Sequence, residues 1–91
     1  MKYKIMSLSI KIRYFASIRE SIGISEESMQ IVDPTSLIEL REILIGLGGG
    51  YAEALARKRT VRCAVNQTMV HETEMLTNGC EVAFFPPVTG G

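Results

Sequence analysis

Apolar and polar residues alternate between Leu8 and Phe15, with the apolar side chains at the even-numbered positions. Successive side chains of a β-strand point to opposite faces of a sheet, so this pattern predicts a half-buried strand whose even-numbered residues face the core. Phe15 falls on the polar face and is the exception to the pattern. A single exposed aromatic side chain is common in folded proteins, so Phe15 by itself does not require a partner.

A helical period of apolar residues begins after Asp33-Pro34. Ser36 and Glu39 have the spacing of a capping box, in which each side chain binds the other residue's backbone N–H at the start of a helix. The apolar face that follows, which we expect to cover a sheet, consists of Leu37, Leu40, Leu44 and Leu47, with Glu39, Arg41 and Glu42 largely off it. Glycines between positions 46 and 50 are expected to end this helix, and they lack the lysine and hydroxyl residue of a phosphate-binding loop.

The remaining patterns predict a short turn or helical segment at 16–22, a second short helix at 51–58, and further strands at 27–32, 61–65, 68–70 and 81–85. One main helix crossing a mixed five-stranded sheet is an α+β arrangement, and this order of elements fits the β-grasp, or ubiquitin-like, fold. In that fold the first and last strands pair in parallel at the centre of the sheet, which would bring Phe15 and Phe85 toward the same face. We expect a single domain over 1–91, with 1–6 as an extension that is disordered, lengthens the first strand, or is not translated if Met6 is the true start.

The segment 86–91 is expected to protrude from this domain as a flexible tail. Pro86 and Pro87 lack backbone N–H groups, so they end the pairing of the last strand and direct the chain away from the sheet. Gly90 and Gly91 have no side chains, so they can enter a narrow channel and leave a terminal carboxylate accessible. Chemistry at this end would have to use the carboxylate itself, whereas the simpler alternative is a frayed terminus without function.

Three segments of the chain carry a resemblance to a known family. AVNQTMV at 64–70, LTNG at 76–79 and EVAFFPPVTGG at 81–91 closely resemble the MoaD/ThiS family of ubiquitin-like sulfur carriers, and within it the small subunits of molybdopterin synthase. A Gly-Gly end is shared with ubiquitin and ThiS, but FFPPVTGG after AVNQT points to the MoaD group. The resemblance is weaker over 14–20, and between Gly23 and Thr60 it is limited to the order of elements.

This resemblance implies that the chain is the sulfur-donor subunit of an enzyme and is not an enzyme alone. An E1-like (MoeB-like) enzyme would use ATP to adenylate Gly91, and a sulfur donor such as a cysteine desulfurase would then leave a thiocarboxylate. Inside a MoaE-like large subunit, the thiocarboxylate would donate sulfur to cyclic pyranopterin monophosphate to form the molybdopterin dithiolene. The complete enzyme would be a heterotetramer of two small and two large subunits, and this chain is expected to bind no cofactor of its own.

The same resemblance assigns roles to individual residues. Gly91 would carry the sulfur, and Gly90 would allow the tail to thread into its partners. The partner interface would consist of Phe15, Met69, Phe85, Pro86, Pro87, Val88 and Thr89. For Phe15, Met69 and Phe85 a position in the core remains the alternative.

Two other functions remain open. The chain could carry sulfur for another pathway, such as thiamine or tungsten-pterin synthesis, although the FFPP segment argues against ThiS. Alternatively, it could be a ubiquitin-like modifier whose Gly91 forms isopeptide bonds with lysines. Capture of a large synthase subunit would favour the carrier, and a ladder of lysine conjugates would favour the modifier.

Composition restricts the classes of partner. Ten basic and ten acidic side chains cancel over 91 residues, which argues against a nucleic-acid or anionic-membrane partner. The Arg57-Lys58-Arg59 run is interpreted as a solvated helix end. No apolar run is long enough to span a membrane and no signal peptide is recognisable, so we expect the protein to be cytoplasmic.

Neither the cysteines nor the histidine predicts a metal site. Cys63 and Cys80 have no second pair or nearby histidine at ligand spacing. They are interpreted as reduced structural residues, with an exposed, reactive Cys80 as the alternative. His71 has no recognisable carboxylate or serine partner, so we expect it on the surface or on an edge strand.

Overall fold

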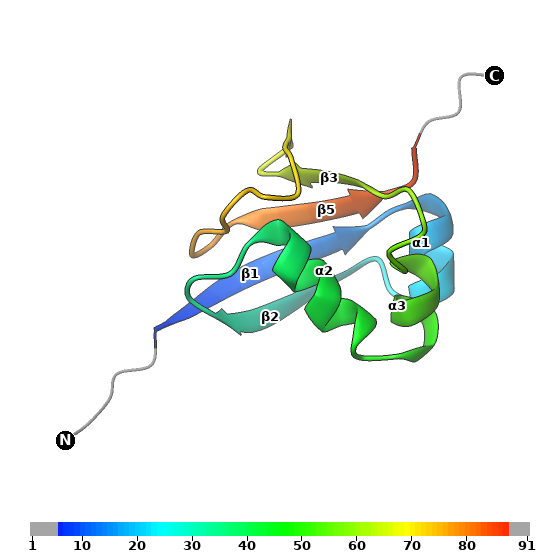
Figure 1. Cartoon of the computed structure of the whole chain (residues 1–91), viewed down its shortest axis with the longest axis horizontal. Helices are drawn as coiled ribbons and strands as arrows, with labels where there is room; N and C mark the ends of the chain where they lie inside the picture. Colours follow the sequence, from blue (N-terminus) through cyan, green and yellow to red (C-terminus); the bar gives the residue numbers. More distant parts are fainter. Residues whose placement is uncertain (1–5, 88–91) are drawn as a thin grey trace.

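The structure is a computed structural model that describes residues 6–87. Five strands form one mixed sheet in the order β2-β1-β5-β3-β4 (Figure 1). The strands are β1 (Ser7–Tyr14), β2 (Glu26–Val32), β3 (Arg62–Val65), β4 (Thr68–Met69) and β5 (Glu81–Phe85). β1 and β5 pair in parallel at the centre of the sheet, and the other pairs are antiparallel. The predicted α+β, β-grasp arrangement is confirmed.

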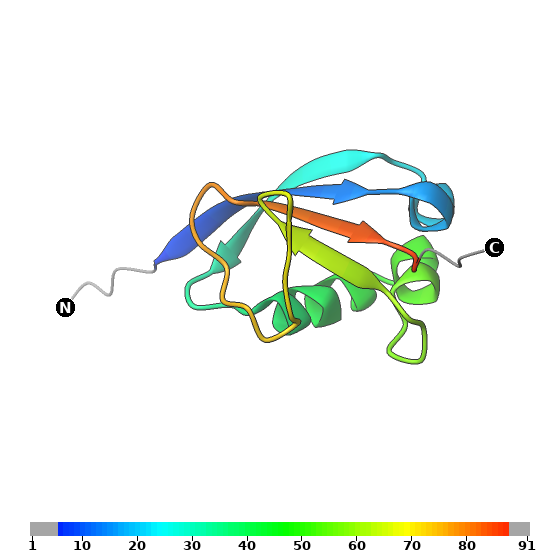
Figure 2. The same ribbon diagram turned by 90° about the horizontal axis from the view of Figure 1, so that it is seen from above.

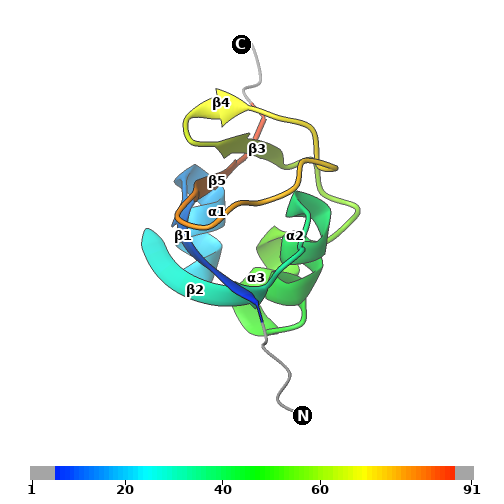
Figure 3. The ribbon, with the colours of Figure 1, turned by 90° about the vertical axis from the view of Figure 1, so that its left-hand side faces the viewer.

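The alternation in β1 divides the sheet into two faces as the sequence predicts. Leu8, Ile10, Ile12 and Tyr14 are all buried in the core. On the neighbouring strand β5, Val82 and Phe84 are fully buried, whereas Glu81, Ala83 and Phe85 are half-buried on the opposite face. Figures 2 and 3 show the sheet as one layer and the longest helix as part of a second layer on its inner face. Among residues 6–87, no helix lies over the outer face (Figures 2 and 3).

The helices are α1 (Ala16–Ile22), α2 (Leu37–Ile45) and α3 (Gly49–Ala54). α2 begins with the predicted capping box: the Ser36 N–H donates to Glu39 Oε1 at 3.0 Å, and the Glu39 N–H donates to Ser36 Oγ at 3.3 Å. The pKa of Glu39 is lowered, first by its hydrogen bond from the Ser36 backbone and then by that from the Ser36 side chain. Within the described chain, no helix is both long and apolar enough to cross a bilayer.

The extent of the apolar face of α2 differs from the prediction. Leu37, Leu40 and Leu44 are fully buried, but Leu47 is 55% exposed. The helix ends at Ile45 with Gly46 as its C-cap, so the helical period no longer directs Leu47 toward the sheet. The inclusion of Leu47 in the core-facing stripe was therefore wrong.

The second short helix was predicted at 51–58, but the structure places it earlier in the chain. α3 starts two residues earlier, at Gly49, and Leu55 caps its C-terminus. A Cβ on Gly50 would lie 1.9 Å from the backbone oxygen of Ser21. Glycine is therefore required at position 50 because α3 approaches α1 closely there. This residue also belongs to the run of glycines that was expected to end α2.

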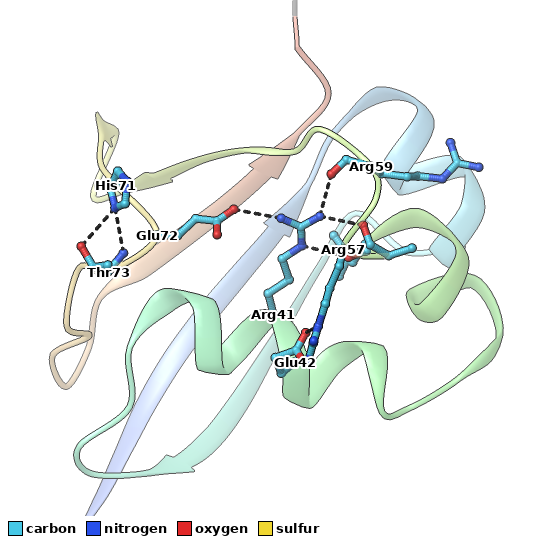
Figure 4. Close-up of polar contacts among 9 residues, drawn as sticks. Arg41, Glu42, Arg57, Arg59, His71, Glu72 and Thr73 are labelled. Carbon is cyan, nitrogen blue, oxygen red and sulfur yellow. Dashed lines mark hydrogen bonds and ion pairs between the residues drawn. The ribbon is translucent and has the colours of Figure 1, made fainter.

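Arg41 is the clearest departure from the sequence pattern. It was placed largely off the apolar face of α2, yet it is only 6% exposed. Its guanidinium donates to the carbonyl oxygens of Leu55, Ala56 and Arg59, each at 2.8 Å. It also donates to Glu72 Oε1 at 2.9 Å (Figure 4). One buried cation thereby fixes the loop between α3 and β3 and the segment that follows β4.

A second polar cluster joins β1, β2 and α3. Glu27 Oε2 accepts hydrogen bonds from the hydroxyl groups of Tyr14 and Tyr51, each at 2.7 Å. The hydrogen bond to Glu27 raises the pKa of Tyr51 to about 12, and desolvation raises that of Tyr14. Tyr14 precedes Phe15 directly, so this cluster anchors the strand end from which the candidate site is built.

Candidate functional site

A groove of about 560 Å³ lies on the outer face of the sheet, where β5 leads into the C-terminal tail. It contains every described member of the predicted partner interface. Its lining residues are Phe15, Ala16, Ala64, Gln67, Met69, Ala83, Phe85, Pro86 and Pro87. Val88, Thr89, Gly90 and Gly91 lie outside the described residues. The structure thus brings together five residues that the sequence resemblance singled out from three separate segments.

Strand register forms the floor of the groove. Ala83 on β5 lies opposite Ala64 on β3, and Ala64 lies opposite Met69 on β4. Two alanines on the adjacent strands β3 and β5 leave a depression between larger side chains, because neither reaches beyond its Cβ. In the sequence, this depression corresponds only to two small residues at outer-face positions. They can be assigned to one depression only when the strand register is known.

Phe15 and Phe85 form one wall of the groove. Their ring centroids are 6.5 Å apart and their planes meet at 87°, which is an edge-to-face contact. The Phe15 N–H donates to the Phe84 carbonyl oxygen at 3.1 Å, so the pairing of β1 with β5 places the two rings together. Both residues are half-buried. Each ring therefore contacts the protein and still offers part of its surface to a partner.

Met69 forms another part of the lining and is 56% exposed. It reaches this position through the tight turn between β3 and β4, in which Asn66 and Gln67 both have positive φ values of 50° and 68°. Two successive positive φ values are typical of the type I′ turn, which joins short antiparallel strands. The Asn66 side chain also accepts a hydrogen bond from the Glu81 N–H at 2.9 Å, which holds the turn against the start of β5.

The groove offers a surface for docking and no catalytic constellation. Among its lining residues, only Gln67 has a polar side chain. General acid–base chemistry requires a titratable group within hydrogen-bonding reach of the reacting atoms, and the groove lining contains none. The lining is therefore suited to bind an apolar part of another protein beside the root of the tail.

The thiols and the histidine lie away from this groove. Cys63 and Cys80 are buried, at 4% and 2% exposure, so the alternative of an exposed, reactive Cys80 is wrong. Burial raises the pKa of the Cys63 thiol to about 11, which disfavours its reactive thiolate form. His71 is exposed, as expected for a surface residue, and its Nδ1 lies 3.1 Å from Thr73 Oγ1. Across positions 6–87, no group of three potential ligand side chains could hold a metal ion.

Comparison with known proteins gives a family for the chain. The model of the ThiS family matches residues 12–91. The chain is 42% identical to the molybdopterin synthase sulfur carrier subunit of Escherichia coli (strain K12), an alignment that covers 90% of this chain and 99% of that protein. It is 39% identical to the subunit of the same name from Haemophilus influenzae, again over 90% of this chain and 99% of that protein.

Solved structures share the fold. SAMP1 from Haloferax volcanii superimposes with a TM-score of 0.72 at 23% identity, covering 91% of this chain and 99% of that chain. A chain from the complex of subunits 1 and 2 of molybdopterin-converting factor from Helicobacter pylori 26695 has a TM-score of 0.60 at 27% identity, covering 92% and 100%. The family match and the near-complete alignments agree with the β-grasp topology. The chain belongs to the ThiS family and, within it, to the group of molybdopterin synthase sulfur carrier subunits.

Proposed function

We propose that this protein is the small, sulfur-carrying subunit of a molybdopterin synthase and that Gly91 carries the sulfur as a C-terminal thiocarboxylate. The observation that carries the proposal is the apolar groove beside Pro86 and Pro87, in a chain that aligns with molybdopterin synthase sulfur carrier subunits over almost its whole length. A docking surface at the root of the tail is what a carrier needs if its chemistry takes place inside a partner. The family match extends to Gly91.

Activation of Gly91 requires a better leaving group than a carboxylate oxygen. In the proposed cycle, an E1-like, MoeB-like enzyme binds ATP, the Gly91 carboxylate attacks the α-phosphorus, and pyrophosphate leaves. The terminal sulfur of a persulfide on a donor such as a cysteine desulfurase then attacks the acyl carbon and expels AMP, which gives an acyl disulfide. Two equivalents of a thiol reductant cleave its S–S bond and are oxidised to a disulfide, so that the donor regains its thiol and the thiocarboxylate sulfur remains on Gly91. The role of the chain is to present this atom, with Gly90 adding no side chain that would obstruct the approach.

Transfer of sulfur takes place in a MoaE-like large subunit in this proposal. The Helicobacter pylori structure is a complex of subunits 1 and 2, which supports a large-subunit partner for this chain as well. Positions 88–91 follow Pro87, and a fully extended segment of four residues, at about 3.1 to 3.6 Å per residue, could reach on the order of 13 Å. The groove can therefore bind at the mouth of the partner's active site while Gly91 reaches cyclic pyranopterin monophosphate inside it. The complete enzyme is proposed to be a cytoplasmic heterotetramer.

A reconstituted transfer reaction tests this proposal. Thiolated chain would be mixed with the large subunit and cyclic pyranopterin monophosphate, and molybdopterin would be measured together with the mass of the chain. Formation of molybdopterin with return of Gly91 to its carboxylate form is expected, and a chain lacking Gly91 is the control. A ladder of lysine conjugates without molybdopterin would instead favour a modifier.

A further inference from the structure

We propose that Arg13 determines the specificity of the groove by pairing with a carboxylate of the partner, next to the apolar side chain that fills the groove. This inference rests on the proposed function, because it treats the large synthase subunit as the partner. It adds a charged contact beside a groove whose lining is apolar except for Gln67. Arg13 precedes Phe15 by two positions, so its side chain emerges on the same outer face of β1.

The register places Arg13 at the edge of the groove floor. Its Cα pairs with that of Ala83, which itself lies opposite Ala64. Arg13, Ala83, Ala64 and Met69 thus form one row across four strands, with the two alanines in the middle. Any side chain that enters the depression above the alanines has Arg13 on one side and Met69 on the other.

The guanidinium of Arg13 is held over an aromatic ring. Its Cζ lies 5.1 Å from the centroid of Phe15, within the distance of a cation–π contact. Because Phe15 packs edge-to-face against Phe85, the cation and both rings form one cluster. This contact restricts the orientation of the guanidinium before any partner binds, which lowers the entropy lost on binding.

The hydrogen-bond donors of Arg13 remain available. Its nearest carboxylate contact is Nη1 to Glu81 Oε1 at 3.7 Å, which is an ion pair but is too long for a hydrogen bond. Within residues 6–87, no hydrogen bond from the Arg13 guanidinium is formed. Lys11, on the same face, differs because its Nζ lies 3.0 Å from Glu26 Oε2. The Arg13 side chain is 41% exposed, so a partner can reach its donors.

The charge around the groove favours an acidic partner group. Arg62 pairs in register with Phe85 and is exposed, and it makes no ion pair with any residue in the described part of the chain. The charged side chains on this part of the outer face are Lys11, Arg13, Arg62, Glu26 and Glu81. Cations therefore outnumber anions there, although the whole chain has a formal net charge of +0. A planar guanidinium with free donors matches a carboxylate in geometry as well as in charge.

Titration calorimetry with the large synthase subunit of the same organism tests this role. Arg13→Glu is expected to weaken binding about tenfold or more, and Arg13→Gln less, because reversal adds repulsion to the loss of the pair. Arg13→Lys should recover part of the affinity. Lys58→Glu, an exposed charge change outside the groove, is the matched control and should leave the dissociation constant unchanged.

The variant Glu81→Gln distinguishes a role of Arg13 in recognising the partner from a role in stabilising the fold. If Arg13 faces a partner carboxylate, Glu81→Gln removes a competing anion, so binding should stay equal or become tighter. If the Arg13–Glu81 pair only supports the strand, Glu81→Gln should weaken binding as Arg13→Glu does.

Binding of Arg13→Glu within twofold of the wild type, with an unchanged melting temperature, would overturn the inference and leave the proposed function standing. Failure of the wild-type chain to bind the large subunit would overturn both.

Discussion

Ala64 and Ala83 lie directly opposite each other on the antiparallel strands β3 and β5, and together they form the floor of the groove beside the C-terminal tail. Ala64 is 7% exposed, so its methyl group already packs closely, whereas Ala83 is half-buried and faces the open groove. The depth of the groove therefore depends on the absence of side-chain atoms beyond Cβ at these two positions.

A larger side chain in the groove should weaken binding of the large subunit without unfolding the domain. Ala83→Leu places additional apolar atoms in the depression, so we expect the affinity for the large subunit to fall about tenfold or more through steric exclusion. The melting temperature should change little because Ala83 faces the groove and not the core. Calorimetry and thermal unfolding measure the two effects. Ser28→Leu, on the outer face of β2 away from the groove, is the control. Equal affinities for Ala83→Leu and the wild type would show that the groove is not the docking surface.

Arg41 should be essential for stability although it is charged. Arg41→Ala removes the donors that satisfy the Leu55, Ala56 and Arg59 carbonyl oxygens, and it leaves Glu72 without its partner. A buried acceptor left without its donor costs about 1 to 3 kcal/mol, so the loss of several such hydrogen bonds should lower the free energy of unfolding by about 3 kcal/mol or more in urea titrations.

Arg57→Ala provides the matched control for this prediction. Arg57 is exposed and pairs with Glu42 on the surface, where ion pairs contribute little because solvent screens them. Its removal should change the free energy of unfolding far less than that of Arg41. Similar losses for both variants would mean that the buried network does not stabilise the loop.

Gly50 should tolerate no side chain. A Cβ there would lie 1.9 Å from the Ser21 backbone oxygen, so Gly50→Ala must separate α3 from α1. We expect this variant to lose about 1 to 3 kcal/mol of stability, as for other overpacked sites. At Gly46, which has a helical φ of −63°, the closest atom to a new Cβ would be Ile43 O at 3.2 Å. Gly46→Ala should accordingly lose less, and a greater loss there than at Gly50 would refute the close-approach explanation.

The free energy of unfolding should decrease at alkaline pH because Tyr14 and Tyr51, whose hydroxyl groups donate to Glu27, lose their protons there. The folded-state pKa of Tyr51 is raised to about 12 and that of Tyr14 is also raised, so the unfolded chain releases these protons at lower pH than the folded chain. The associated stability is therefore fully present below the unfolded pKa of about 10 and is lost as pH rises through the folded values.

Urea titrations between pH 9 and pH 12 measure this loss. Tyr51→Phe removes one of the two titrating groups and should make the decrease shallower than in the wild type. The raised pKa of Cys63 contributes with the same sign in both proteins, so it cancels in the comparison. Parallel pH profiles for the two proteins would count against a contribution from Tyr51.

The local parts of the fold could be predicted from the sequence because their causes are local. The period of β1 and the capping box of Ser36 and Glu39 depend on neighbouring residues, and the structure confirms both. Leu47 was misplaced because periodicity alone did not locate the end of α2 at Ile45. The burial of Arg41 was missed because its partners lie 14 to 31 residues away in the chain.

The site was predicted by a different route. Phe15 stood out as an aromatic on the polar face of its strand, the expected fold brought Phe85 toward the same face, and the family resemblance added Met69. The structure places all three in one groove. Ala64, Ala83 and Arg13 were not selected, because their relation to the groove depends on the register of four strands. An outer-face alanine or arginine has no distinguishing pattern until the neighbouring strands are aligned.

The proposed function depends on conversion of the Gly91 carboxylate to a thiocarboxylate, which changes the intact mass of the chain. The untagged protein would be incubated with ATP, an E1-like activating enzyme and a sulfur source, with a chain lacking Gly91 as the control. We expect the mass to increase by the replacement of one oxygen atom with sulfur, and the control to remain unchanged. An unchanged mass would contradict thiocarboxylate formation at Gly91, provided that the same enzyme preparation thiolates the Escherichia coli sulfur carrier subunit in parallel.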